Sequence, residues 1–308
     1  MSAPSVWLPK EFSFLSGYAT PVRRRRILVP MQAIADDSGS GGQGQVIVMA
    51  GLIGRAEWWA DFSDRWDACL KEPPAIRYFK FYQAAHRKGQ FAGFSEQARD
   101  NKMLSLVQTL DERHPFTVLH VTVNLAEHTK AIAHVFPKRS KRLFPAHGAE
   151  QSPYFDAYSA FVRAACVHLW RQGEREQFDF IVDEHPSLGW RAKEWYPAVR
   201  AAMPEEYRSI MPAEPITKND EPFLPLQAAD LIAGLQRDAN TPPLGTAFAW
   251  LADSFTNVKP SPMCEYHGAQ YFAELISRVD AMRKAGPPPS NVMLAVLQIP
   301  GVPIRLGE

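Results

Sequence analysis

The sequence predicts one domain of the α/β class built on a mixed β-sheet, and three observations indicate this. Two apolar, β-branched runs, residues 26–35 and 46–53, are joined by a glycine-rich stretch, which is typical of an antiparallel β-hairpin. After the hairpin, segments with the two-residue period of strands alternate with segments of helical spacing. With 46% hydrophobic and 22% charged residues, the composition is that of an ordinary globular protein. Together these patterns predict helices layered against a mixed sheet.

Three more strands are expected after the hairpin. Residues 116–125 (FTVLHVTVNL) alternate with the period of a strand, and residues 178–182 (FDFIV) form a short apolar run that ends at two acids. Residues 207–216 are expected to form a further strand. The hairpin and these strands would supply the sheet.

Helices are predicted where apolar residues recur at helical spacing. The first covers residues 57–70 and places Trp58 and Trp66 on one face. A second begins after Ser95, a residue type favoured at a helix N-cap, and runs to about Arg113. The remaining predicted helices are residues 153–170, 190–203, 226–237 and 270–283.

No low-complexity linker divides the chain, so we expect a single domain over residues 1–308, with its core at about residues 22–284. Residues 1–21 are expected to form an N-terminal arm. Residues 285–308 are expected to form a proline-rich C-terminal extension, because the GPPPS sequence near its start cannot continue a helix.

Composition and charge exclude several classes of protein. Three widely separated cysteines without a C-x-x-C pair indicate neither a disulfide framework nor a structural zinc site. No uninterrupted apolar segment approaches the roughly 20 residues of a membrane helix, and the first residues do not resemble a secretory signal. We therefore expect a soluble, cytoplasmic protein that does not span a membrane.

The charge pattern hints at a phosphate-bearing partner. The formal net charge is only +1, so no strong global field attracts nucleic acid. Two short basic runs, residues 23–26 and 137–142, nevertheless stand out in a neutral chain. Each run alone is more typical of a solvated surface.

The glycines of the expected hairpin, Gly39, Gly41 and Gly44, have the spacing G-x-G-x-x-G of a dinucleotide-binding turn. That turn must lie between a strand and a helix, whose N-terminus holds the pyrophosphate. Here the residues that follow, QVIVMAGLIG, are typical of a strand. We therefore expect a flexible hairpin loop and no dinucleotide site.

Three acids in apolar surroundings are the main candidates for chemistry. Asp36 ends the first strand, Asp183 ends the FDFIV strand, and Asp230 lies inside an apolar helix. Taken singly, each acid also fits a turn or an ion pair. Together, two strand ends and one late helix can bring carboxylates to one edge of a sheet. Clustered carboxylates suit hard cations such as Mg²⁺ or Mn²⁺.

The segments around these acids resemble the DUF3800 family. ADDSGSG at residues 35–41 is similar to the D-E-S-G opening of that family, and VDEHP at residues 182–186 resembles its strand-end acid. LQAADLIAG at residues 226–234 resembles its late Q-x-A-D-x-x-A helix. The similarity extends over roughly residues 27–240 in the same order.

This resemblance implies an RNase H-like fold, with a mixed β-sheet that opens with a β-hairpin and is flanked by α-helices. It also implies divalent-metal nuclease chemistry. Asp36, Asp183 and Asp230 stand at the positions of the metal ligands. Asp37 stands where the family usually has Glu, and Lys218 is the candidate for a lysine that precedes the late helix. Asp37 and Glu184 are expected to assist the ligands.

A basic and aromatic segment, residues 76–91, is a candidate for substrate binding. It carries Lys80, Arg87 and Lys88 among aromatic residues, a mixture that can hold single-stranded nucleic acid by stacking and phosphate contact. The alternative is a buried aromatic segment followed by a solvated basic turn.

The functional hypothesis is an Mg²⁺- or Mn²⁺-dependent nuclease acting on RNA or DNA, with water as the nucleophile. In it, Lys80 or Lys218 would neutralise the substrate phosphate. The alternative is a non-catalytic module that binds nucleic acid or protein on the same scaffold and needs no metal. A third hypothesis is hydrolysis of small phosphoesters.

Overall fold

The computed structural model describes the sheet and most of the helices around it. The described residues are 31–40, 44–111, 113, 115–135, 152–184, 189–241, 248–252, 259–260 and 264–285. The expected N-terminal arm, both basic runs and all but Ala285 of the proline-rich extension lie outside them.

The predicted hairpin is confirmed. Strand β1 (Met31–Ser38) pairs antiparallel with β2 (Val46–Arg55). Both strands are largely buried because their β-branched and small apolar side chains lie between two layers of helices. The hairpin therefore forms the centre of the sheet.

Two of the hairpin glycines are required by the geometry of the turn. Gly39 and Gly44 have φ values of +98° and +126°, which L-residues with side chains rarely adopt. A Cβ atom on Gly39 would lie 2.7 Å from the carbonyl oxygen of Val46, and one on Gly44 would lie 2.9 Å from Nη2 of Arg237. These glycines reverse the chain, as predicted, and Gly41 lies outside the described residues.

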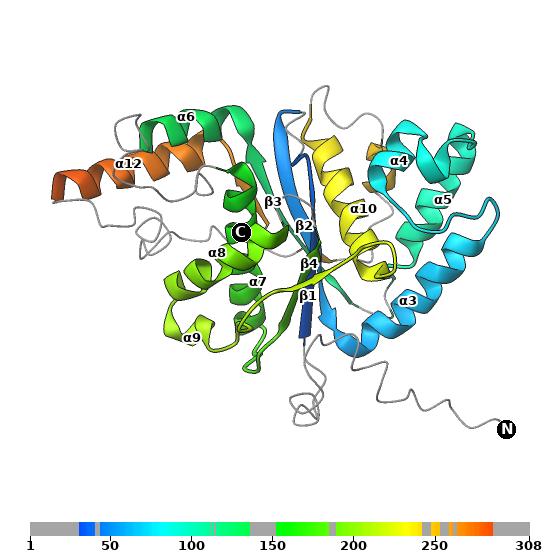
Figure 1. Cartoon of the computed structure of the whole chain (residues 1–308), viewed down its shortest axis with the longest axis horizontal. Helices are drawn as coiled ribbons and strands as arrows, with labels where there is room; N and C mark the ends of the chain where they lie inside the picture. The colour runs from blue at the N-terminus through cyan, green and yellow to red at the C-terminus, as the bar shows by residue number, and fades with distance from the viewer. Residues whose placement is uncertain are drawn as a thin grey trace.

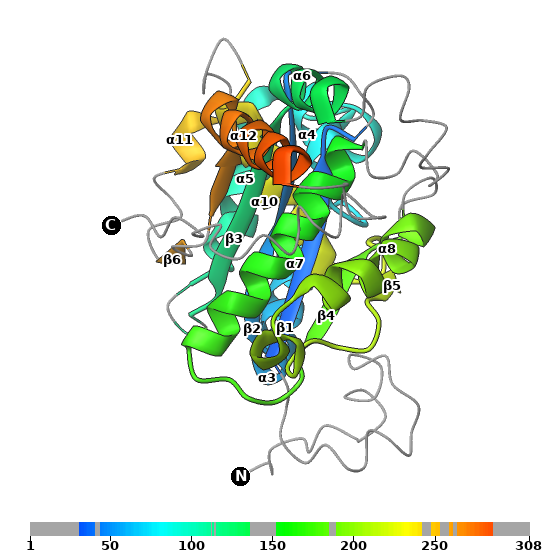
Figure 2. The same ribbon diagram turned by 90° about the vertical axis from the view of Figure 1, so that its left-hand side faces the viewer.

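The described part of the chain contains a seven-stranded mixed sheet (Figures 1 and 2). Its strand order is β5-β4-β1-β2-β3-β6, with β7 also paired to β3. Antiparallel pairing joins β1, β2 and β3, whereas β4 runs parallel to β1 and β5 runs parallel to β4. The later strands are β3 (Thr117–Asn124), β4 (Asp179–Asp183), β5 (Ile216–Lys218), β6 (Lys259–Pro260) and β7 (Glu265–His267). The predicted α/β class with a mixed sheet is confirmed.

Helices cover both faces of the sheet (Figure 1). One layer comprises α6 (Leu125–Val135), α7 (Pro153–Arg171), α8 (Gly189–Ala202), α9 (Glu205–Arg208) and α12 (Ala269–Ala285). The other comprises α3 (Ala56–Lys71), α4 (Phe81–His86), the 3-10 turn Gly89–Phe91, α5 (Glu96–Gln108), α10 (Leu224–Ala239) and α11 (Ala249–Ala252). Successive side chains of each strand point to opposite faces of the sheet and so belong to two separate apolar cores. Ala33 and Ala35 lie in the core on the α7 side, whereas Ile34 lies in the core on the α10 side.

One predicted strand is wrong. Residues 207–216 do not form a strand: Glu205–Arg208 is helical, and only Ile216–Lys218 joins the sheet. Pro212 and Pro215 explain the difference, because proline has no N–H to donate to a sheet ladder. By contrast, the predicted N-cap at Ser95 is confirmed, since its Oγ accepts a hydrogen bond from the Ala98 N–H at 3.2 Å.

Candidate metal centre

Two of the predicted acids lie side by side on adjacent parallel strands. Asp183 ends β4, as expected, but the strand end expected at Asp36 is wrong, because β1 stays paired with β2 as far as Ser38. The last paired residues of β1 and β4 are Ala35 and Val182, so the next residues, Asp36 and Asp183, are neighbours. Asp36 lies two residues after Ile34, and alternate residues share a face. Both carboxylates therefore point to the side of the sheet that α10 covers.

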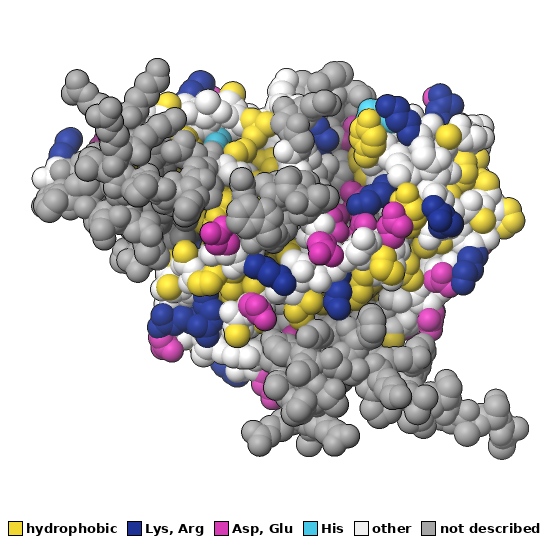
Figure 3. Space-filling model, viewed as in Figure 1, with side chains coloured by type: hydrophobic (Ala, Val, Ile, Leu, Met, Phe, Trp, Pro, Cys, Tyr) yellow, Lys and Arg dark blue, Asp and Glu magenta, His cyan; other side chains and the backbone are white. Residues whose placement is uncertain are grey.

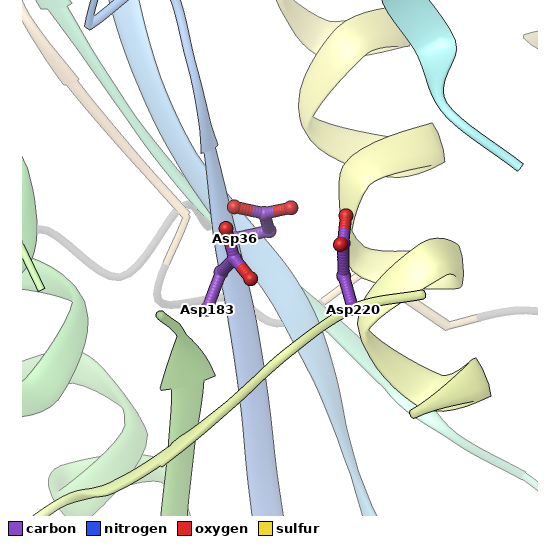
Figure 4. Close-up of side chains that lie close together, drawn as sticks. All are labelled: Asp36, Asp183 and Asp220. Atoms are coloured by element: carbon purple, nitrogen blue, oxygen red, sulfur yellow. The ribbon is translucent and has the colours of Figure 1, made fainter. Parts of the chain in front are cut away.

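A third acid, Asp220, completes the group. It lies in the turn between β5 and α10, at the end of the segment that passes in front of β4 and β1 in Figure 4. One carboxylate oxygen from each of Asp36, Asp183 and Asp220 lies within 4.8 Å of the other two. Asp36 and Asp220 are buried, whereas Asp183 is half-buried, so the group opens toward solvent on the Asp183 side.

Gln227, buried on α10, fixes the turn that carries Asp220. Its Nε2 donates to the carbonyl oxygens of Asp220 and Glu221 at 3.0 and 2.9 Å. Its Oε1 accepts from Nε1 of Trp66 and from the N–H of Phe79, both at 3.0 Å. One amide side chain thus joins the acid-bearing turn, α3 and the segment before α4.

Asp230 lies one helical turn after Gln227 and is not one of the three grouped acids. Its Oδ2 accepts a hydrogen bond of 2.7 Å from the N–H of Phe81, at the start of α4. The carboxylate therefore fixes this segment of the chain beside the site. The role of Asp230 as a metal ligand stays a prediction.

Lys80 supplies a cation at the same place. Its Nζ forms an ion pair with Oδ2 of Asp220, and its side chain is about one-third exposed. The hydrogen bonds of Phe79 to Gln227 and of Phe81 to Asp230 hold the backbone on both sides of Lys80. The lysine predicted to bind substrate thus lies against the acids.

The protein leaves the negative charge of these acids only partly compensated. Burial, followed by repulsion from Asp230 and Asp183, raises the pKa of Asp36 well above its usual range, and Lys80 opposes this shift. Burial also raises the pKa of Asp230 to about 6, against the opposing effects of the Phe81 N–H and Lys80. A divalent cation would relieve this repulsion, and the all-oxygen donor set is the kind that Mg²⁺ and Mn²⁺ prefer.

Asp37 lies on the opposite face of β1 from Asp36. Its N–H donates to Oδ1 of Asp36 at 2.7 Å, which orients that carboxylate. On its own side, Asp37 contributes to the raised pKa of Tyr154 on α7, after the larger effect of burial. The backbone of Asp37 therefore positions the Asp36 carboxylate, while the predicted role of Asp37 beside the ligands stays a prediction.

Lys218 and Glu184 lie at the edge of the group. Lys218 is the register partner of Asp183, so the two side chains are neighbours on the same face. The N–H of Glu184 donates to the carbonyl oxygen of Lys218 at 2.9 Å, and the Glu184 side chain is exposed. Their predicted catalytic roles remain predictions.

The surface near the site is mixed in charge. Figure 3 shows acidic and basic side chains next to one another over the ends of the central strands and the start of α10. Arg87 and Lys88, predicted to bind substrate, lie in the exposed turn after α4. Helix α4 connects them to Lys80, which contacts Asp220.

Few features of the sequence point to Asp220. The turn that contains it reads NDEPF and offers two acids, Asp220 and Glu221, with no spacing that selects one of them. The only local signal is an acid between the end of a strand and a helix with Pro in its first turn. Such acids are common in turns, so the signal alone is weak.

Within the described residues, no helix combines the length and the apolar character needed to cross a membrane. The chain was also compared with protein-family models, with curated proteins and with solved structures. None of these three comparisons found a match.

Proposed function

We propose that this protein hydrolyses phosphodiester bonds of nucleic acid with Mg²⁺ or Mn²⁺ held by Asp36, Asp183 and Asp220. The observation that carries the proposal is the approach of the three carboxylates, one oxygen of each lying within 4.8 Å of the other two. The raised pKa of Asp36 agrees with it, because burial and neighbouring acids disfavour the carboxylate, and a bound cation would favour its charged form. An RNase H-like assignment of the mixed sheet, implied by the family resemblance, is part of the same proposal.

When bound at such a site, a divalent ion lowers the pKa of water and stabilises the charge that develops on phosphate oxygens. The protein's own residues prepare the surroundings. Gln227 holds Asp220 in place, and the Asp37 N–H orients Asp36. Lys80 places a positive charge beside the acids, where it would contact a phosphate oxygen of the substrate.

The ion pair between Lys80 and Asp220 is the observation that favours the second candidate, a non-catalytic binding module. In that case, the lysine alone would compensate Asp220 and the fold would need no metal. The two candidates differ in one measurable property, which is affinity for Mn²⁺ or Mg²⁺ at millimolar concentration.

The test combines calorimetric titration with Mn²⁺ and Mg²⁺ and a cleavage assay on labelled RNA and DNA. Asp36→Asn and Asp220→Asn are expected to weaken metal binding by about tenfold or more and cleavage by about a hundredfold or more. Asp64→Asn, on the exposed face of α3, is the matched control and should leave both unchanged.

Three outcomes would count against this assignment. Absence of metal binding by the unaltered protein would favour the binding module. Metal binding without cleavage of RNA or DNA would refute the nuclease. Loss of metal binding in Asp230→Asn but not in Asp220→Asn would restore the ligand set expected from the sequence and refute the role of Asp220.

A further inference from the structure

An exposed tyrosine with basic neighbours lies two residues after Lys80, which contacts Asp220 of the proposed metal centre. Among the described residues, Tyr82 is one of three exposed large hydrophobic side chains and is 58% exposed. Nζ of Lys88 lies 3.3 Å from its hydroxyl oxygen and 5.5 Å from the centre of its ring. The His86 ring is 4.6 Å away, centre to centre. These three side chains form a cluster on α4 and the turn after it.

The turn that presents this cluster is rigidly built. Arg87 has a φ of +48°, an unusual conformation for a residue with a side chain. Gln83 stabilises it: its carbonyl oxygen accepts from the N–H of Lys88 at 2.9 Å, and its Oε1 accepts from the N–H of Gln90 at 2.8 Å. Strained backbone that is held in this way is frequent at binding sites. The basic side chains of Arg87 and Lys88 are therefore presented from a fixed backbone.

The segment is also anchored at both ends. Phe79 and Phe91 are buried, and their rings meet edge to face with centres 6.0 Å apart. Next to the first anchor, Lys80 contacts Asp220 and the Phe81 N–H binds Asp230. Because α4 has only six residues and is about 9 Å long, the cluster stays beside the acids.

We propose that Tyr82, His86, Arg87 and Lys88 form a platform that binds single-stranded nucleic acid and leads it to the acids. The platform rests on the proposed function for its substrate class. An exposed ring can stack on a base of any sequence, and neighbouring cations contact the backbone phosphates. The acid near these cations is Glu96, whose carboxylate lies 3.9 Å from Arg87. In a duplex the bases are already stacked on one another, so the ring selects single strands.

The test measures fluorescence anisotropy of a labelled single-stranded oligonucleotide and of its duplex, with a chelator present so that no cleavage occurs. Tyr82→Ala is expected to weaken single-strand binding by about tenfold, whereas Tyr82→Phe keeps the ring and should bind like the unaltered protein. Lys88→Gln should make the slope of log affinity against log salt concentration less steep, by about the amount expected for the loss of one phosphate contact. Tyr266→Ala is the control, because Tyr266 is 54% exposed but lies on β7, at the opposite edge of the sheet from β5.

The possible results separate the platform from the nuclease. Equal single-strand binding by Tyr82→Ala and the unaltered protein, or a preference for duplex, overturns the platform even if the protein is a nuclease. Tyr82-dependent binding of single strands by a protein that cleaves no nucleic acid supports the platform and refutes the nuclease. The proposal is also overturned if Tyr266→Ala weakens single-strand binding as much as Tyr82→Ala does. The loss would then not be specific to the surface that carries Tyr82.

Discussion

Lys80 is the cation that partly compensates the negative charge of the acids when no metal is bound. Its ammonium group contacts Asp220 and opposes the rise in pKa that burial causes at Asp36 and Asp230. A metal ion at the same carboxylates would compete with this ammonium group for Asp220. The lysine would therefore stabilise the folded protein and, at the same time, oppose the binding of a metal ion at these carboxylates.

Lys80→Met is expected to lower the free energy of unfolding by about 1–2 kcal/mol, because a buried carboxylate loses its partner while Lys80 itself is partly solvated. The same variant should bind Mn²⁺ several-fold more tightly, because the competing cation is gone. Urea unfolding with a chelator and calorimetric titration measure the two effects. Lys80→Arg keeps the charge and is the matched control, and unchanged or weaker Mn²⁺ affinity in Lys80→Met would contradict the competition.

Asp36 and Asp183 could be predicted as site residues because each follows a buried apolar run, which is visible in a sequence, although β1 continues past Asp36 to Ser38. Asp220 could not be predicted in the same way. Its position depends on two contacts of Gln227. One is with Trp66, 161 positions away in the chain, and the other is with Asp220 itself, 7 positions away. Hydrogen bonds of this kind follow no sequence period, so only the structure shows which acid of the turn they bring to the site.

At the scale of elements, α10 organises the site through one face. Gln227, Asp230 and Gly234 are three and four residues apart and so lie on the same side of the helix. Gln227 and Asp230 bind the backbone on either side of Lys80, and Gly234 lies against the Phe81 ring. This face explains why a glycine and two polar residues occur in an apolar helix.

Gly234→Ala is expected to destabilise the protein by about 1–3 kcal/mol, because the added Cβ would overlap the Phe81 ring. Displacement of Phe81 should also weaken its hydrogen bond to Asp230 and lower single-strand binding by the neighbouring platform. Thermal unfolding and oligonucleotide binding measure these effects. Gly93→Ala is the matched control, since a Cβ there meets nothing within 4 Å. Equal stability of the two variants would refute tight packing at Gly234.

Long elements were predictable and short ones were not. The hairpin, α3, α7 and α10 have enough residues for their period to appear in the sequence. Strands β5, β6 and β7 have three, two and three residues. No period can be read from so few residues, and their place in the sheet is set by neighbouring strands. In addition, Pro212 and Pro215 interrupt the strand expected at residues 207–216, so only Ile216–Lys218 joins the sheet.

At the scale of the whole molecule, a buried charged network joins the end of the described chain to its centre. Nδ1 of His267 lies 3.0 Å from Asp156 on α7, and Nε2 lies 2.8 Å from Glu265. The imidazole also stacks on the ring of Tyr271 of α12, with the two ring centres 3.7 Å apart. The two carboxylates raise the pKa of His267 to about 9 despite its burial. The network thus ties β7 and α12 to α7.

Stability should therefore fall at alkaline pH. An unfolded histidine titrates near pH 6.5, so the contribution of His267 is complete below that pH and is lost as the pH rises through about 9. The loss should be of the order of 2–3 kcal/mol. Urea unfolding between pH 6.5 and about 9 measures it. His267→Gln should lack this loss, and His134→Gln, at an exposed pair with Asp280, should keep it.

A direct measurement guards against a variant that does not fold. An NMR titration of the unaltered protein should show the His267 imidazole charged at neutral pH. If it titrates below pH 7, the network does not stabilise the fold in this way.

The contacts of Gln227 also determine how the acid-bearing turn can move. Surface turns commonly fluctuate on nanosecond to microsecond timescales without the core. Here the turn shares one amide side chain with Trp66, a fully buried residue of α3. Opening the turn would therefore disturb the core, and such motions belong to rare, cooperative openings. The position of Asp220 is therefore as stable as the core itself, and a cation that binds the proposed centre would reach it from the half-buried Asp183 side, without movement of the turn.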